Sequence, residues 1–331
     1  MASSRAGGKN VSRRFFWMAV GIVAAIGLYT AGWHYAAGRL LDRANATLAA
    51  LGRDGNRAVC ETPAVHGYPF RIGLYCDATY VERAALGAAA STGAFRSAAQ
   101  IYDPRHVVAE ADAPARVTLP GMVPLDVDWE ALRASARLAR PLPELVSIEA
   151  RKVEAVADMP GPDGPTAFTA DRLELHLRPN GGNLDAAARF EALEPGRFLL
   201  GEGTVPPLSG LVDVTVADGI ERLRARRGEL RGLSLMVRQA EVRTASGAGL
   251  TAAGTISVGQ DGLVDARLTL GALKAQELAP VLAAAFPAEA DRIRAAFAGL
   301  ATLGDAPSLP LTVTKGQVYL GFIPLGALPP L

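Results

Sequence analysis

A long apolar stretch near the N-terminus is the strongest feature of the hydropathy pattern. Residues 15–37 contain no Asp, Glu, Lys or Arg, and a helix needs about 20 residues to cross a bilayer. The basic residues before it are Arg5, Lys9, Arg13 and Arg14, and the aromatic residues suited to its two interfaces are Trp17, Tyr29, Trp33 and Tyr35. The pattern predicts a transmembrane helix over 15–37.

The basic cluster sets the expected orientation of this helix. Because Lys and Arg are retained in the cytoplasm, residues 1–14 form a cytoplasmic tail and the chain after residue 37 is exported. A cleaved signal peptide is the alternative, but its apolar core is shorter, and an amphipathic juxtamembrane helix continues here over 38–52. We expect an uncleaved, single-pass bacterial inner-membrane protein with its bulk in the periplasm.

Alternating apolar and polar positions predict that residues 53–331 form a β-rich domain. One segment, 123–138, changes phase near Trp129, which indicates a bulge; a helix beginning near Asp128 competes with this interpretation. The predicted strands are 71–77, 123–129, 173–178, 184–193, 211–216, 233–242, 250–258, 263–270, 309–314 and 317–322.

Helical spacing interrupts this pattern once. Residues 276–303 predict a helical hairpin divided at Pro287. The Pro- and Gly-rich segment 159–165 is interpreted as a long turn within one architecture, with two lobes split near residue 160 or 205 as the alternative. The predicted fold class is mainly β with minor α: a transmembrane helix followed by an extended, strongly curved antiparallel sheet with a helical hairpin insertion.

The two cysteines, Cys60 and Cys76, are close together in the sequence. Alternation over 71–77 places Cys76 on the inward face of a strand with Ile72 and Leu74, and a turn at 67–69 lets the chain fold back. In an oxidising periplasm the two cysteines can pair, so we expect a disulfide; free thiols would fit only a cytosolic segment.

Composition narrows the function classes. The net charge of +1 argues against nucleic acid as a partner. The four histidines lie at 34, 66, 106 and 176 without metal-ligand spacing, and no catalytic or phosphate-binding motif is present. We therefore expect no enzyme activity, no metal and no cofactor; the alternative is an enzyme whose catalytic residues are distant in the sequence and meet as a polar cluster in a cleft.

Two features suggest binding. An arginine-rich segment could contact anionic lipid or lipopolysaccharide phosphates, although a solvated face balanced by Glu221 and Glu229 is the alternative; its arginines are Arg222, Arg224, Arg226, Arg227 and Arg231. The inner face of the sheet could line a groove for acyl chains, or form an ordinary core under the helices of 276–303. The residues in question are Ala252, Gly254, Ile256, Val258, Val264, Ala266 and Leu268.

Several sequence blocks then suggest a family. They are the run Gly67, Tyr68, Pro69, Phe70 and Arg71 between the cysteines, Ile101–Val108, Asp126–Ser135 and Lys315–Gly326. With the N-terminal anchor, they resemble the alphaproteobacterial family catalogued as domain of unknown function 2125. The resemblance implies a membrane-anchored envelope protein and carries over no catalytic residue. The strand-rich pattern is also somewhat similar to AsmA-type lipid-transfer proteins.

These observations lead to two functional hypotheses. The first is a protein of the cell envelope that binds or shields lipid-like ligands on its curved sheet. The second is a structural or assembly module that docks other envelope proteins, which requires an exposed edge strand or an apolar patch. The expected partners are the inner membrane and either lipids or other envelope proteins.

Overall fold

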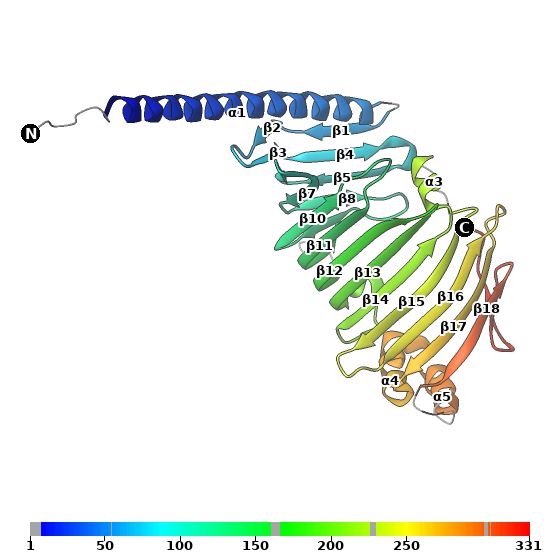
Figure 1. The fold of residues 1–331 in the computed structure, drawn as a ribbon. Helices are drawn as coiled ribbons and strands as arrows, with labels where there is room; N and C mark the ends of the chain where they lie inside the picture. The colour runs from blue at the N-terminus through cyan, green and yellow to red at the C-terminus, as the bar shows by residue number, and fades with distance from the viewer. Residues whose placement is uncertain (1–7, 54, 160–165, 226–229, 301–303, 305) are drawn as a thin grey trace, which may run out of the picture.

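A single antiparallel sheet forms almost the whole domain in the computed structural model, which describes residues 8–53, 55–159, 166–225, 230–300, 304 and 306–331 (Figure 1). The first ten strands are β1 Arg57–Cys60, β2 Ala64–His66, β3 Arg71–Cys76, β4 Thr79–Arg83, β5 Ala88–Thr92, β6 Phe95–Gln100, β7 Asp103–Ala111, β8 Ala115–Thr118, β9 Leu125–Asp128 and β10 Ala131–Arg137. The next ten are β11 Leu145–Ala157, β12 Thr166–Asn180, β13 Asn183–Pro195, β14 Leu208–Val216, β15 Ser234–Thr244, β16 Gly249–Val258, β17 Val264–Leu273, β18 Ser308–Thr314, β19 Gln317–Leu320 and β20 Ile323–Ala327.

The first ten strands are five long strands, each broken near its middle. In the first hairpin, Cys60 pairs with Thr79 before the break and Ala64 pairs with Tyr75 after it, so one register continues across the gap. The long strand β11 then pairs with β9 along one half and with β10 along the other. The sheet is therefore a meander in which each long strand lies beside the strand that precedes it in the sequence.

The line of breaks continues as β-bulges in the later strands. Lys152 and Ala192 have φ of 50° and 48°, which non-glycine residues adopt only where a local irregularity requires it. The pairing of β15 with β16 shifts register between Val237 and Ala240. Such bulges bend strands and increase their twist. In Figure 1 the first strands accordingly run nearly along α1, whereas the last ones run steeply.

Helix α1, Gly8–Leu51, lies along the edge of the sheet formed by β1 and β2 (Figure 1). The predicted transmembrane and juxtamembrane helices are thus one continuous helix. Its part Arg13–Leu51 is long and apolar enough to cross a membrane, and the apolar window in it is not buried against the domain. The helix also covers backbone groups that an edge strand would otherwise expose.

Short helices pack at the two ends of the strands. They are α2 Arg197–Leu200, α3 Gly219–Arg224, α4 Ala275–Ala285 and α5 Ala290–Leu300, with 3₁₀ turns at Ala84–Leu86 and Pro287–Glu289. One core cluster lies under α4, where Leu278 packs with Ala248 and Ala272. A second cluster joins Val258, Val264, Ala266 and Val313 at the opposite strand ends.

The predicted fold class is confirmed, and so is the helical insertion at 276–303 as far as it is described. The bulge at Trp129 is confirmed as the break between β9 and β10, and the alternative helix from Asp128 is wrong. The last predicted strand ends earlier than expected, because Phe322 lies in a turn and is 92% exposed. Strand β20 and most strands before residue 120 were not predicted.

Strand pairing is continuous across both positions considered for a division into lobes. β11 pairs with β12 across residue 160, and β13 pairs with β14 across residue 205. Residues 160–165 of the predicted turn lie outside the described residues.

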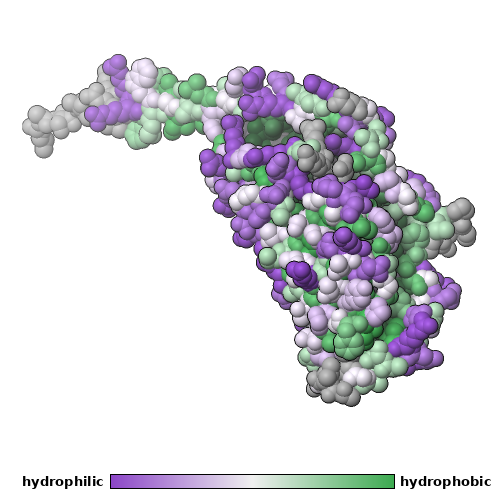
Figure 2. Space-filling view, turned by 90° about the vertical axis from the view of Figure 1, so that its right-hand side faces the viewer, coloured by the Kyte–Doolittle hydropathy of each residue, from purple (hydrophilic) through white to green (hydrophobic). Residues whose placement is uncertain are grey.

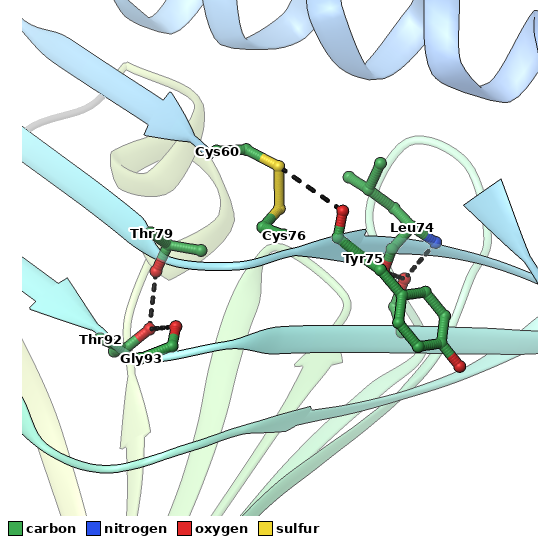
Figure 3. The surroundings of a disulfide bond; sticks show 8 residues. Cys60, Leu74, Tyr75, Cys76, Thr79, Thr92 and Gly93 are labelled. Carbon is green, nitrogen blue, oxygen red and sulfur yellow. Dashed lines mark hydrogen bonds between the residues drawn. A yellow bond between two sulfur atoms is a disulfide. The ribbon is translucent and has the colours of Figure 1, made fainter. Parts of the chain in front are cut away.

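The predicted disulfide between Cys60 and Cys76 is present, with a Cα–Cα distance of 5.2 Å (Figure 3). It joins the end of β1 to the end of β3, across the first break. Nearby, the backbone ladder between β3 and β6 is interrupted, and the Ser97 hydroxyl lies 3.0 Å from both the nitrogen and the oxygen of Leu74. A Cβ on Gly73 would come within 1.6 Å of the Ser97 backbone oxygen, so only glycine fits there. The disulfide therefore reinforces a place where the ladder is incomplete.

Removing this disulfide should destabilise the domain. We expect the double variant Cys60→Ser, Cys76→Ser to lower the free energy of unfolding by about 3 kcal/mol, because a loop of this length restricts the unfolded chain by that amount. Denaturant unfolding of the purified full chain in detergent, followed by circular dichroism, measures the difference. A reductant should shift the wild type towards the variant and leave the variant unchanged; equal stability of both proteins would contradict the prediction.

Candidate functional site

One face of the sheet carries a row of apolar residues that are direct cross-strand partners. The row crosses ten strands, from β7 to β18, and at about 4.8 Å between strands its nine spacings span roughly 43 Å. Its members are Ala109, Ala134, Ile148, Leu175, Ala188, Val212, Ala240, Ala252, Leu270 and Leu309. We refer to these ten residues as the apolar row.

The apolar row is not covered like a core. None of its ten side chains is buried, Ala188 is exposed, and Val212 is 38% exposed. Five of the ten members are alanines, which leave shallow places between the larger side chains of the row. No large side chain among the described residues is fully buried anywhere in the domain. The middle of this face therefore lacks the second layer that usually covers an apolar sheet face.

The same face is closed near both ends of the strands. At one end α4 packs its Leu278 onto Ala272, and the loop after α2 is tied to α4 by the Thr204 nitrogen, 2.9 Å from the Ala284 oxygen. At the other end α3 packs against β13, with Ile220 buried. Figure 2 shows hydrophobic surface between hydrophilic residues and a hollow near the top of the view with a hydrophobic inner wall.

This arrangement refines the predicted groove. Of the residues named from the sequence, Val258, Val264 and Ala266 are buried in a core cluster with Val313, but this cluster lies at the strand ends opposite to α4 and not under the predicted helices. The others are Ala252, Gly254, Ile256 and Leu268, which are only half-buried. The uncovered surface thus lies nearer the middle of the strands, and its greatest exposure is at Ala188 and Val212, which the sequence did not single out.

The opposite face is polar and charged. A cavity of about 560 Å³ crosses β3, β6, β7, β10, β11 and β12 on this face and includes Arg71, Glu110, Arg133 and His176. Its charges are neutralised locally, since the Arg133 Nε lies 3.0 Å from Glu110 and the Arg172 guanidinium lies 3.4 Å from Glu149. Because these pairs bridge adjacent strands, they stabilise the sheet and leave little net charge in the cavity.

Asp185 on β13 is the centre of the most extensive polar network. Its buried carboxylate accepts hydrogen bonds from Arg178 at 2.9 Å, Thr215 at 2.8 Å and Arg238 at 3.0 Å. These hydrogen bonds, led by the one from Arg178, hold the pKa of the Asp185 carboxyl well below its usual range despite burial, which raises it. The network joins β12, β13, β14 and β15.

The Gly67–Arg71 run joins the domain to α1 through hydrogen bonds and aromatic packing, beside the contacts that α1 makes with β1 and β2. It forms the tip of the hairpin of β2 and β3, with a cis peptide between Tyr68 and Pro69. The Trp33 Nε1 donates to the Arg71 oxygen at 2.9 Å, and the hydroxyls of Thr30 and Tyr68 are 2.8 Å apart. Tyr29 also donates to the Pro69 oxygen. The aromatic rings of Trp33, His34 and Tyr68 pack together.

The predicted arginine-rich segment lies at α3. Arg222 and Arg231 line a cavity of about 290 Å³ that also includes Asp218 and Glu221. The Arg231 Nε donates to the Leu331 backbone oxygen at 3.2 Å. Arg224 is exposed, and Arg226 and Arg227 lie outside the described residues. An anionic lipid contact at these residues stays a prediction.

Comparison with known families gives one match. A family model described as "Uncharacterized protein conserved in bacteria (DUF2125)" matches residues 33–329. The match begins at Trp33, the helix residue that is hydrogen-bonded to Arg71, and includes the Gly67–Arg71 run. The exposed apolar stretch before Tyr29 lies outside the match. Comparison with the curated proteins gives no match.

Trp33 should hold the hairpin tip to the helix. Trp33 is only 7% exposed, so Trp33→Ala removes both its packing and its hydrogen bond to Arg71. We expect the local opening free energy at 67–71 to fall by about 3 kcal/mol, the effect of deleting a well-packed aromatic side chain. Hydrogen–deuterium exchange of the full chain in detergent measures it. Tyr35→Ala is the control, because Tyr35 is 71% exposed; equal exchange in both variants would refute the assignment.

Asp185 should contribute a pH-dependent part of the stability. Because its folded-state pKa is lowered, its contribution is fully present above the unfolded pKa of about 3.9 and is lost as the pH falls below it. We expect Asp185→Asn to lower the free energy of unfolding at pH 7 by about 2 kcal/mol.

Unfolding curves of the wild type and of Asp185→Asn between acid and neutral pH measure this contribution. The difference between the two should be constant at neutral pH and shrink below about pH 4. Asp213→Asn is the control, because its half-exposed carboxylate contacts only one of the same arginines. A difference that grows in acid would contradict the sign.

Proposed function

We propose that this chain, which belongs to the DUF2125 family of uncharacterised bacterial proteins, is a membrane-anchored protein of the cell envelope that binds the apolar chains of lipid-like molecules along its sheet. The apolar row carries this proposal. It crosses ten strands in direct register, and none of its members is buried.

The chemistry of the row fits an extended hydrocarbon ligand. Burial of apolar surface contributes about 25 cal/mol per Å², so a chain that lies across many strands gains affinity from each one without a specific polar contact. Small side chains such as Ala188 and Ala240 leave room for such a chain close to the backbone. The charged residues are on the opposite face, so nothing in the row requires the ligand to be charged there.

The expected location supports the same function. Helix α1 offers one candidate membrane span with Arg13 and Arg14 at its start, which favours export of the domain. The disulfide between Cys60 and Cys76 suits an oxidising compartment such as the periplasm. A domain tied to the membrane surface in this way has direct access to lipids. Arginines such as Arg224 could then contact anionic headgroups.

A docking function is the second candidate, and strand β20 favours it. Among the residues that the structure describes, β20 pairs with β19 alone, and every residue in β20 is exposed. Phe322 is 92% exposed, and Ile323 and Leu325 are 52% and 58% exposed. An exposed, apolar edge strand is a template for pairing with another chain. The same protein could be joined to a partner at this edge while its apolar row stays free.

Photocrosslinking in cells separates the two functions. The photoreactive residue p-benzoylphenylalanine replaces Val212 in the apolar row, or Met236 as a control, and mass spectrometry identifies the adducts. Met236 is on the neighbouring strand, faces the other way and is 53% exposed. A lipid adduct at 212 and not at 236 is the expected result, because only Val212 belongs to the apolar row.

The same experiment has outcomes that exclude each candidate. Protein adducts at 212 would show that the row is a docking surface, and no adduct at 212 would refute ligand binding. A third position, Phe322, reports on the edge strand. A specific protein adduct there supports docking through β20, and its absence counts against the second candidate.

A further inference from the structure

The position of the hairpin tip on α1 fixes its depth relative to the membrane. The apolar part of α1 that is free of the domain runs from Phe15 to Leu28, because Tyr29 is the first residue hydrogen-bonded to the hairpin tip. These 14 residues span about 21 Å at 1.5 Å each, whereas the hydrocarbon layer is about 30 Å thick. The bilayer must therefore extend beyond Tyr29, to the level of the hairpin tip.

The hairpin tip has the side chains that such a position requires. Tyr68 is 48% exposed and Phe70 is 69% exposed, although both have large aromatic rings. Arg71, next to them, is also exposed. Aromatic rings prefer the interface between headgroups and hydrocarbon, and arginine extends its charge to the phosphates. In water, the same exposed rings would be unfavourable.

Two further turns at the same ends of the strands continue this surface. In the turn between β6 and β7, Ile101 is 37% and Tyr102 is 78% exposed, and the Ile101 nitrogen donates to the Phe70 oxygen at 3.1 Å. In the turn between β10 and β11, Leu138 is 42% exposed, and its nitrogen donates to the Arg105 oxygen at 2.7 Å. The three turns are thus linked by backbone hydrogen bonds.

Charge and direction agree with a lipid surface. Exposed arginines outnumber exposed acidic residues at these turns. The acidic residues are Asp103 and Glu144, and the arginines are Arg71, Arg105, Arg137 and Arg140. The N-terminal half of α1 projects from the domain on the side where the β2–β3 tip lies (Figure 1). A membrane crossed by α1 would therefore meet the turns.

We infer that these three turns are a membrane-contact surface that inserts at the boundary between hydrocarbon and headgroups in the leaflet opposite Arg13 and Arg14. Tyr68, Phe70 and Tyr102 enter the interface, and the arginines bind lipid phosphates. The surface holds the domain against the bilayer in one orientation, in addition to the tether that α1 provides. The inference rests on α1 crossing the membrane and does not depend on what occupies the apolar row.

Fluorescence of the full chain in vesicles tests this surface. Tyr102→Cys is labelled with an environment-sensitive fluorophore, and the protein is reconstituted into vesicles of equal parts phosphatidylcholine and phosphatidylglycerol. Because Cys60 and Cys76 are joined, the new cysteine is the one available for labelling. Leu86→Cys is the matched control, since Leu86 is 58% exposed in a turn at the opposite strand ends.

We expect headgroup spin-labelled lipid to quench the probe at 102 several-fold more than the probe at 86, and iodide in the water to do the reverse. A probe at Phe70→Cys should behave like that at 102, which guards against a local effect of one substitution. Equal iodide quenching at 102 and 86 would overturn the inference. So would a probe at 102 that is protected from iodide but not quenched by lipid, because protein would then cover the surface.

Discussion

The described part of the chain places no complete second layer on the apolar face of its one wide sheet, and most features of this molecule follow from that constraint. A sheet that is apolar on one side normally packs against another sheet or a layer of helices. Here the helices cover only the strand ends, where Leu278 and Ile220 are buried. The row through Ala188 and Val212 stays accessible, and the opposite face keeps its strands together with ion pairs, of which the network at Asp185 is the most extensive.

Curvature makes such a sheet stable as a single layer. Breaks in the first strands and bulges near Val156 and Ala192 bend it, so that apolar side chains on one face shield one another without a covering layer. Closure into a barrel would remove both edges, but this sheet stays open. One edge is covered by α1, and the other, β20, is exposed.

The sequence predicted those parts that depend on local pattern. The long alternating runs around Leu175 and Ala252 indicated strands correctly, and the spacing of Leu278 and Leu282 indicated a helix. Short strands such as β5 escaped prediction, because Ala88 to Thr92 has no alternation of apolar and polar residues. The prediction that Cys60 pairs with Cys76 came from their spacing, the alternation of one strand and the expected export of this segment to an oxidising compartment. The uncovered row could not be predicted, because its members come from ten strands and their register is set by bulges. The membrane-facing turns depend on where the hairpin tip meets α1, which no local pattern specifies.

The meander has a consequence for how the protein assembles. Every long strand pairs with the long strand that precedes it in the sequence, so no strand needs a distant part of the chain as its pairing partner. Sheets built this way have a low contact order for an all-β protein and can fold comparatively fast. The first hairpin already contains Cys60, Cys76 and the partner surface for α1. The domain can therefore grow outwards from its anchor during synthesis, one strand at a time, with each new strand added to the free edge left by the last.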